Sequence, residues 1–435
     1  MLEKNAYFSD SLKSSDPEVF EAIAGELCRQ SNQIELIASE NFVSQASLDA
    51  LGSVMINKTV EGYPGRRYYG GVEYADLLET LAIERACTLF GCNHANVQPH
   101  SGSQANLSVF VALLEPGDTI LSMDLLSGGH LSHGSKANVS GKWFNVGHYG
   151  VSGSGGRIDM AEVERLAKKM SPKLIVCGGS SYPRAIDFKH FREIADGVGA
   201  WLLVDMAHFA GLVAGGQHPH PFPHAHVATA TTYKNLRGVR GGIILWNDDG
   251  LRNKLNSAVF PGVQGSVMLN AIAAKAVCLG EALKPEFKAY AIDVLANARA
   301  LAAALVARGV GVITGGTDTP LLLVDLRPLA LTGDVASDAL EYAGLTCNKN
   351  SIPGDPMSVQ VTSGLRFGVS AGTARGFCVN EFTTIGGWIA DVLLGLAASG
   401  PSENAAIERR IRKRSLALCQ SFPIYPSQLG YLVSD

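Results

Sequence analysis

The sequence VATATTYK at residues 227–234 decides the fold class, because it is a small, β-branched and nearly uncharged stretch that ends in a lysine. This composition is typical of a buried strand. The glycine-rich sequence NLRGVRGG follows at residues 235–242 and predicts a turn directly after Lys234. We therefore expect Lys234 at the end of a buried strand. Poor hydration there lowers the pKa of its amine and makes it more nucleophilic toward an aldehyde.

A second strand is predicted just upstream at WLLVD, residues 201–205, and it ends in the carboxylate of Asp205. A buried carboxylate is costly unless it has a cationic partner. A lysine for a Schiff base and an aspartate for a pyridinium nitrogen are the two protein groups that pyridoxal phosphate most needs. The alternative is that Lys234 is an ordinary solvated loop residue.

The order of elements predicts an α/β protein of two units. Apolar strands are expected at residues 119–123, 174–177, 201–205, 227–231 and 242–245, with helices at 160–170 and 188–198. This alternation favours a mostly parallel sheet. Helical sequence at residues 285–309 leads to a second unit with strands at 321–326 and 364–369. We predict an N-terminal arm and helix at residues 1–34, a large domain at 35–285, and a smaller domain with a tail at 286–435.

Composition narrows the possible partners and location. The chain has 435 residues with a net charge of -4, which argues against nucleic acid or an anionic membrane as the main partner. The eight cysteines show no C-x-x-C spacing, and prolines interrupt the histidines between residues 218 and 226, so no metal site is expected. The N-terminus is too polar for a signal peptide, and no apolar run suggests a membrane span. We expect a cytoplasmic protein.

Three further motifs contain residues that could contact a ligand. Ser101, Gly102 and Ser103 precede a helix expected at residues 107–114, and suit either a phosphate or an ordinary helix cap. In SGGHLSHG, residues 127–134, His130 could lie flat on an aromatic ring, or the glycines could form a structural turn. Arg366, in a predicted strand, could grip a substrate carboxylate through two parallel hydrogen bonds or form a structural salt bridge.

Taken together, these residues resemble the serine hydroxymethyltransferase family, which are fold-type I pyridoxal phosphate enzymes. The likeness runs from about residue 36 to about residue 392. It is carried by LIASENF (36–42), EGYPGRRYYGG (61–71), VQPHSGSQAN (97–106), GGHLSHG (128–134), VDMAHFAGL (204–212) and SGLRFGV (363–369). The resemblance implies a large domain with a mostly parallel, seven-stranded type of sheet and a smaller C-terminal α/β domain.

The resemblance also implies roles by position. Lys234 would form the Schiff base, Asp205 would pair with the pyridine nitrogen and His130 would stack on the ring. The remaining contacts would be His208 and Ser180 near the phenolic oxygen; Ser101, Gly102 and Ser103 on the phosphate, with Gly265 from a neighbouring subunit; Arg366 and Ser39 on the substrate carboxylate; and Glu61, Tyr68, Tyr69, Leu125, Gly129, Leu131 and Asn350 near tetrahydrofolate or the reacting hydroxymethyl group. Glu61 and Tyr69 would come from the partner subunit, which implies a homodimer or a dimer of dimers with shared active sites.

Several positions near the substrate depart from the family pattern. Thr59 and Tyr233 stand where the family has tyrosine and histidine. Residues 265–267 read Gly-Ser-Val where the family has Gly-Gly-Pro, and residues 368–370 read Gly-Val-Ser where it has Gly-Thr-Pro.

The smaller Thr59 makes room beside the substrate α-carbon, so we expect the substrate α-methyl-L-serine, with D-alanine as product. The alternatives are ordinary serine–glycine interconversion, a folate-independent aldolase, and a non-enzymatic binding module.

Overall fold

The computed structural model describes residues 6–152 and 155–428. Its centre is a seven-stranded sheet in the order β4-β12-β11-β10-β9-β5-β6. The strands are β4 (His94–Asn96), β5 (Thr119–Met123), β6 (Asn145–Tyr149), β9 (Leu174–Cys177), β10 (Trp201–Asp205), β11 (Val227–Thr231) and β12 (Gly242–Trp246). Five neighbouring strands, from β6 to β11, run parallel, and β12 is antiparallel to both β11 and β4. The predicted mostly parallel α/β sheet is confirmed.

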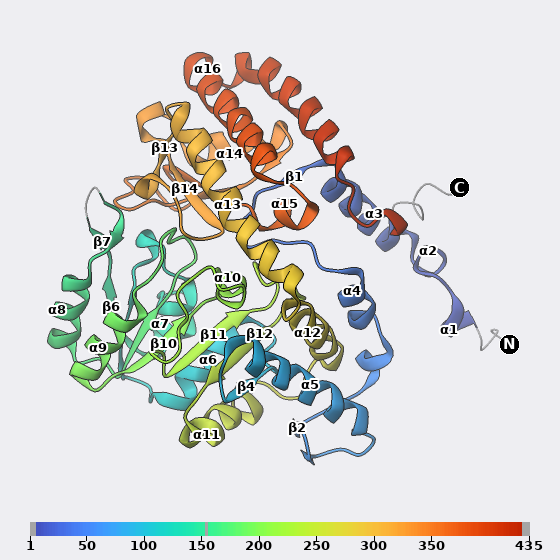
Figure 1. Ribbon diagram of the computed structural model, residues 1–435, viewed down its shortest axis with the longest axis vertical. Coiled ribbons are helices and arrows are strands. Elements are labelled where there is room, and N and C mark those ends of the chain that lie inside the picture. Colours follow the sequence, from blue (N-terminus) through green and yellow to red (C-terminus); the bar gives the residue numbers. More distant parts are fainter. Residues whose placement is uncertain (1–5, 153–154, 429–435) are drawn as a thin grey trace.

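The sheet is buried on both faces because helices cover each side (Figure 1). Alternation along β10 separates the two cores: Leu202 and Val204 point into one cluster and Leu203 into the other. The first cluster is covered by α5 (Glu73–Phe90), α8 (Met160–Met170), α9 (Phe188–Val198) and α12 (Leu269–Ala282), and the second by α6 (Gly102–Leu113) and α11 (Arg252–Ser257). The helices predicted at residues 160–170 and 188–198 are confirmed.

A smaller antiparallel sheet lies above the large one, in the order β13-β14-β17-β16 (Figure 1). Its strands are β13 (Gly311–Val312), β14 (Leu321–Asp325), β17 (Gly364–Gly368) and β16 (Asn348–Asn350). The helices α13 (Pro285–Ala307), α14 (Gly333–Tyr342) and α16 (Val379–Ser421) pack around it. The predicted strands at 321–326 and 364–369 correspond to β14 and β17.

The N-terminal segment packs against this smaller unit. Helix α3 (Pro17–Asn32) contacts α16, and β1 (Ile34–Glu35) pairs in parallel with β15 (Leu345–Thr346). Helices α1 (Ala6–Ser9) and α2 (Leu12–Ser15) extend away from the body of the molecule (Figure 1). The division of the chain at residues 34 and 285 stays a prediction.

The expectation that no apolar segment reaches membrane-spanning length is wrong for two helices. By length and composition, α13 and α16 are apolar enough to cross a bilayer. The core helices of water-soluble proteins pass the same test. These two helices pack against each other. About half of the most apolar 18-residue stretch of each helix is buried inside the protein. Their apolar character is therefore accounted for by the core that they form.

Candidate active site

A pocket opens where the carboxyl ends of the parallel strands meet, as is usual for ligand sites in α/β sheets. Strand β10 ends at Asp205 and β11 ends at Thr231, three residues before Lys234. The pocket has an empty volume of about 390 Å³. It is lined by Ser101, Gly102, Ser103, Asn106, His130, Gly179, Ser180, Asp205, Ala207, His208, Thr231, Tyr233 and Lys234. Eight of the nine predicted cofactor-binding residues therefore line one pocket, and Gly265 is the exception.

Lys234 is buried, with 5% of its surface exposed. Burial lowers the pKa of its amine to about 8, although the nearby Asp205 carboxylate partly offsets this effect. The backbone is fixed beside the side chain, because the Asn41 amide and the Arg237 N–H both donate to the Lys234 carbonyl, at 2.9 Å and 3.0 Å. The site thus holds an amine that loses its proton more readily than an exposed lysine.

Asp205 is held by groups that the sequence did not assign. Its Oδ2 accepts hydrogen bonds from His133 Nε2 at 2.9 Å and Asn106 Nδ2 at 2.8 Å, and its Oδ1 accepts from the Ala207 N–H at 3.0 Å. Burial alone would raise the pKa of Asp205, but the His133 hydrogen bond and the nearby histidines hold it below its usual value. The aspartate is therefore ionised and oriented, as a partner for a protonated ring nitrogen must be.

Asn106 and Ser132 together connect this aspartate to His130. Asn106 Nδ2 donates to Ser132 Oγ at 3.0 Å, and Ser132 Oγ lies 2.7 Å from His130 Nδ1. The Ser132 backbone N–H also donates to His130 Nδ1, so this ring nitrogen is an acceptor and the proton of the neutral ring is on Nε2. Burial lowers the pKa of His130 to about 4, which keeps its ring uncharged at neutral pH. An uncharged ring is suited to stacking.

The phosphate cradle differs from the prediction in one respect. The helix expected at residues 107–114 begins earlier, at Gly102, and Ser101 caps it by accepting from the Gln104 N–H at 3.2 Å. The backbone N–H groups of the first turn therefore point into the pocket from the positive end of the helix dipole. A side chain at position 102 would meet Thr231 at 2.6 Å, so only glycine fits there.

Arg366 reaches the edge of the pocket from β17. Its Nη1 donates to the Ser180 carbonyl at 2.8 Å and its Nε donates to Asn348 Oδ1 at 3.1 Å. Burial lowers the pKa of Arg366 to about 10, so it remains charged at neutral pH. A partly buried, charged guanidinium of this kind suits a carboxylate ligand.

The donor set fits pyridoxal phosphate. The Nδ1 atom of buried His208 has no hydrogen-bond partner among the described residues, although a buried polar atom normally has one. Burial also lowers the pKa of His208, so its ring is uncharged. A bound group with polar oxygens would satisfy this ring, while Lys234, Asp205 and the cradle provide the amine, the carboxylate and the anion site.

The remaining predicted residues lie outside this pocket. Glu61, Tyr68 and Tyr69 belong to or flank the hairpin β2 (Gly62–Tyr63) and β3 (Arg66–Arg67), and the two tyrosines are 73% and 47% exposed. Thr59 is exposed, and Glu61 Oε1 lies 3.9 Å from where a side chain at Gly265 would begin. Ser39 lines an adjacent cavity with Tyr233 and Arg240. Leu125 and Leu131 each begin a short 3-10 helix, Gly129 lies between these two helices, and Asn350 ends β16. Their roles stay predictions.

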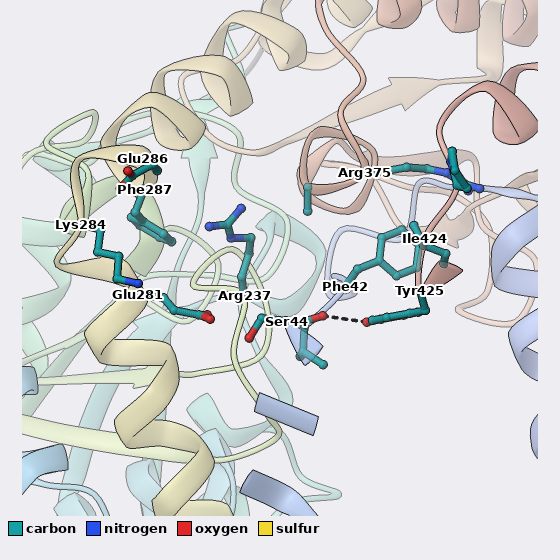
Figure 2. Close-up of a pocket in the computed structure, with 13 residues that line it drawn as sticks. Phe42, Ser44, Arg237, Glu281, Lys284, Glu286, Phe287, Arg375, Ile424 and Tyr425 are labelled. Carbon is teal, nitrogen blue, oxygen red and sulfur yellow. Dashed lines mark hydrogen bonds between the residues drawn. The ribbon is translucent and has the colours of Figure 1, made fainter. Parts of the chain in front are cut away.

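A larger cavity, with an empty volume of about 1080 Å³, contains Arg237 from the loop after Lys234 and is not the candidate site (Figure 2). Arg237 enters it with its guanidinium 4.1 Å from the ring centroid of Tyr290. Glu281, Lys284 and Glu286 give it mixed charge, and Phe42, Ile424 and Tyr425 form its far side (Figure 2). It contains none of the predicted cofactor-binding residues, so the smaller pocket, which contains eight of them, is the candidate site.

Comparison with known proteins gives a consistent result. The family model described as serine hydroxymethyltransferase matches residues 12–389. A protein named serine hydroxymethyltransferase from Paramagnetospirillum magneticum is 61% identical over 97% of this chain and 98% of its own length. Proteins of the same name from Rhodospirillum centenum and Novosphingobium aromaticivorans are 61% and 59% identical, each over 98% of this chain and over 99% and 98% of their own lengths.

Proposed function

Because the chain belongs to the serine hydroxymethyltransferase family, we propose that it moves the hydroxymethyl group of α-methyl-L-serine to tetrahydrofolate and leaves D-alanine. The chain is a pyridoxal phosphate-dependent hydroxymethyltransferase with tetrahydrofolate as co-substrate. The identity of the amino acid is the part that we propose.

The observation that carries the proposal is Thr59, which stands where the family has tyrosine. Replacing an aromatic ring by a small side chain frees space beside the substrate α-carbon, and a well-packed site would otherwise reject an added methyl. In α-methyl-L-serine the methyl occupies the position of the α-hydrogen of L-serine. Replacing the hydroxymethyl group by a proton on the same face therefore gives D-alanine.

Bound pyridoxal phosphate would supply an electron sink for breaking the bond between the α- and β-carbons. The chain's own residues orient and bind. Arg366 holds the substrate carboxylate, and its own position is fixed by Ser180 and Asn348. Asp205 is kept ionised by His133, and Lys234 provides an amine that can take up and release a proton near neutral pH. His130 and His208 are uncharged, so they pack against the cofactor without repelling a cationic group.

L-Serine is the second candidate substrate, and a specific observation favours it. The relatives that are about 60% identical over nearly the whole chain are named serine hydroxymethyltransferase. Their names support the serine–glycine reaction more directly than the α-methylserine reaction. Thr59 and the other departures are the reason to place α-methyl-L-serine first.

The test compares kcat/KM for L-serine and α-methyl-L-serine, with and without tetrahydrofolate. We expect α-methyl-L-serine to be preferred and its cleavage to need tetrahydrofolate. Efficient cleavage of L-serine alone would establish the second candidate instead. Equal rates without tetrahydrofolate would indicate an aldolase, which the retained Glu61, Tyr69 and Asn350 argue against.

Thr59→Tyr tests the carrying observation. We expect this change to lower kcat/KM for α-methyl-L-serine by roughly 10- to 200-fold relative to L-serine, since one methyl in a pocket is worth about 1–3 kcal/mol. The matched control is Thr383→Tyr on the exposed face of α16, which should leave the ratio unchanged. An unchanged ratio in Thr59→Tyr would remove the main support for α-methyl-L-serine.

We further propose that the protein is a cytoplasmic homodimer or dimer of dimers with shared active sites. Glu61, Tyr69 and Gly265 do not line the pocket of their own chain, and Glu61 and Gly265 lie beside each other. A second copy that contributed these residues would complete the site. Exposed apolar side chains around them, at Val54, Ile56, Tyr68 and Tyr74, suit such an interface.

A further inference from the structure

Ser266 forms an unusual pair of contacts with the backbone of Val60. The Val60 N–H donates to Ser266 Oγ at 3.1 Å, and the same hydroxyl donates to the Val60 carbonyl at 3.1 Å. The Val267 N–H donates to this carbonyl as well, also at 3.1 Å. Val60 is fully buried, so both of its backbone polar groups need partners within the protein.

These contacts depend on the residues by which this chain departs from its family. Glycine at position 266 would have no hydroxyl, and proline at position 267 would have no N–H to donate. With the family's Gly-Gly-Pro, all three hydrogen bonds would be absent. The departures at residues 266 and 267 therefore act on the same short segment as the departure at Thr59, although they are about 200 residues apart in the chain.

The loop that carries Ser266 is itself anchored to the phosphate cradle. The Gln264 side chain donates to the Gln98 carbonyl at 2.8 Å and accepts from the His100 N–H at 3.3 Å. Its backbone N–H donates to the Val259 carbonyl at 3.0 Å. The segment from Thr59 to Glu61 is thus linked, through Ser266 and Gln264, to the turn that precedes Ser101.

We infer that Ser266 is a positioning residue for the reaction, which holds Thr59 and Glu61 in the places where they meet the amino acid and tetrahydrofolate. This inference rests on the proposed function for the roles of Thr59 and Glu61. Tyrosine at position 59 would bring a large ring that packs and orders its segment, whereas threonine brings little contact area. In this chain the hydrogen bonds from Ser266 to the Val60 backbone hold the segment instead of that ring.

The test uses Ser266→Ala and Ser266→Thr in the full-length holoenzyme. Alanine removes the hydroxyl and leaves the buried Val60 groups underpaired, whereas threonine keeps the hydroxyl. We expect Ser266→Ala to lower kcat/KM about tenfold, mainly by raising KM for tetrahydrofolate and the amino acid, and to speed amide hydrogen exchange in the peptide that contains Val60. In Ser266→Thr, both kcat/KM and the exchange rate of the Val60 peptide should stay within about twofold of wild type.

Ser415→Ala is the matched control, because buried Ser415 also donates to a backbone carbonyl, that of Ala343, but in the smaller unit. It should reduce thermal stability without changing KM or exchange near Val60. The inference is overturned if Ser266→Ala leaves KM and the Val60 exchange unchanged. It is equally overturned if Ser266→Ala lowers the melting temperature and speeds exchange throughout the chain, because the role would then be structural.

The amino acid used is whichever one the wild-type enzyme cleaves. If that is L-serine alone, the proposed substrate fails, while the Ser266 effect is still measured against wild type on L-serine. The exchange measurement needs no substrate at all. The failure of the proposed function and the failure of this inference therefore give different results.

Discussion

Lys234 and Lys275 are two buried lysines in different environments. Lys275 Nζ donates to the carbonyls of Val97, Pro99 and Gly242, at 2.6, 2.9 and 3.1 Å, so it fixes the backbone below the phosphate cradle. Lys234 instead lines the cofactor pocket beside Asp205 and His208. Burial lowers the pKa of Lys275 to about 7 and that of Lys234 to about 8. A lowered pKa alone therefore does not distinguish the two lysines, and we propose Lys234 as the reactive one because it lines the candidate pocket.

The pKa of Lys234 makes the stability of the cofactor-free protein depend on pH. Between about pH 8 and pH 10.5 the unfolded chain binds a proton at this amine that the folded chain has released, so stability rises with pH across this window. Lys234→Met lacks this titration. We expect it to be more stable than wild type at pH 7, by on the order of 3 kcal/mol at most, and the difference to shrink as the pH rises above 8.

Urea unfolding of both cofactor-free proteins from pH 7 to pH 10.5 measures this difference. The control is Lys189→Met, whose exposed side chain should give a small, pH-independent difference. A Lys234→Met difference that did not change with pH would contradict the account, because the amine would then have the same pKa in the folded and unfolded chains.

At the scale of elements, apolar runs were predictable and polar ones were not. Strands β5, β9, β10 and β11 match their predicted bounds because each is a run of apolar or β-branched residues. Strands β4 and β6 read HAN and NVGHY, and nothing in such polar sequence predicts a strand. The antiparallel direction of β12 was also not predicted, since it depends on how the turn between Thr232 and Gly241 folds back.

The residues of the candidate active site show the same limit of sequence-based prediction. Pocket residues at the ends of predicted strands or in glycine-rich turns were found, because their local sequence carries the signal. Asn106 and His133 were missed, although both lie in motifs quoted for the resemblance. Their role depends on reaching Asp205, which is 99 and 72 residues away in the chain. The sequence signal that could have found them is a polar side chain on an otherwise buried helix or turn, since such groups need partners.

At the scale of the whole molecule, shared sites predict complementation. Lys234→Ala removes the amine of a subunit's own pocket, whereas Glu61→Gln removes a group that we propose acts in the partner's pocket. Each variant alone should be nearly inactive. After both are unfolded, mixed in equal amounts and refolded, heterodimers should have one intact site, and roughly a quarter of wild-type activity should return. No recovered activity in verified heterodimers would contradict the sharing of Glu61.

The most direct test of the account is to find which amine carries the cofactor. Borohydride reduction of the holoenzyme, followed by peptide mapping, should place the pyridoxal phosphate adduct on Lys234. Lys275 is the internal comparison, because it is also buried and has a lowered pKa but is occupied by three carbonyls. An adduct on Lys275 or on a surface lysine, or a protein that takes up no cofactor, would contradict the assignment of this pocket as the active site.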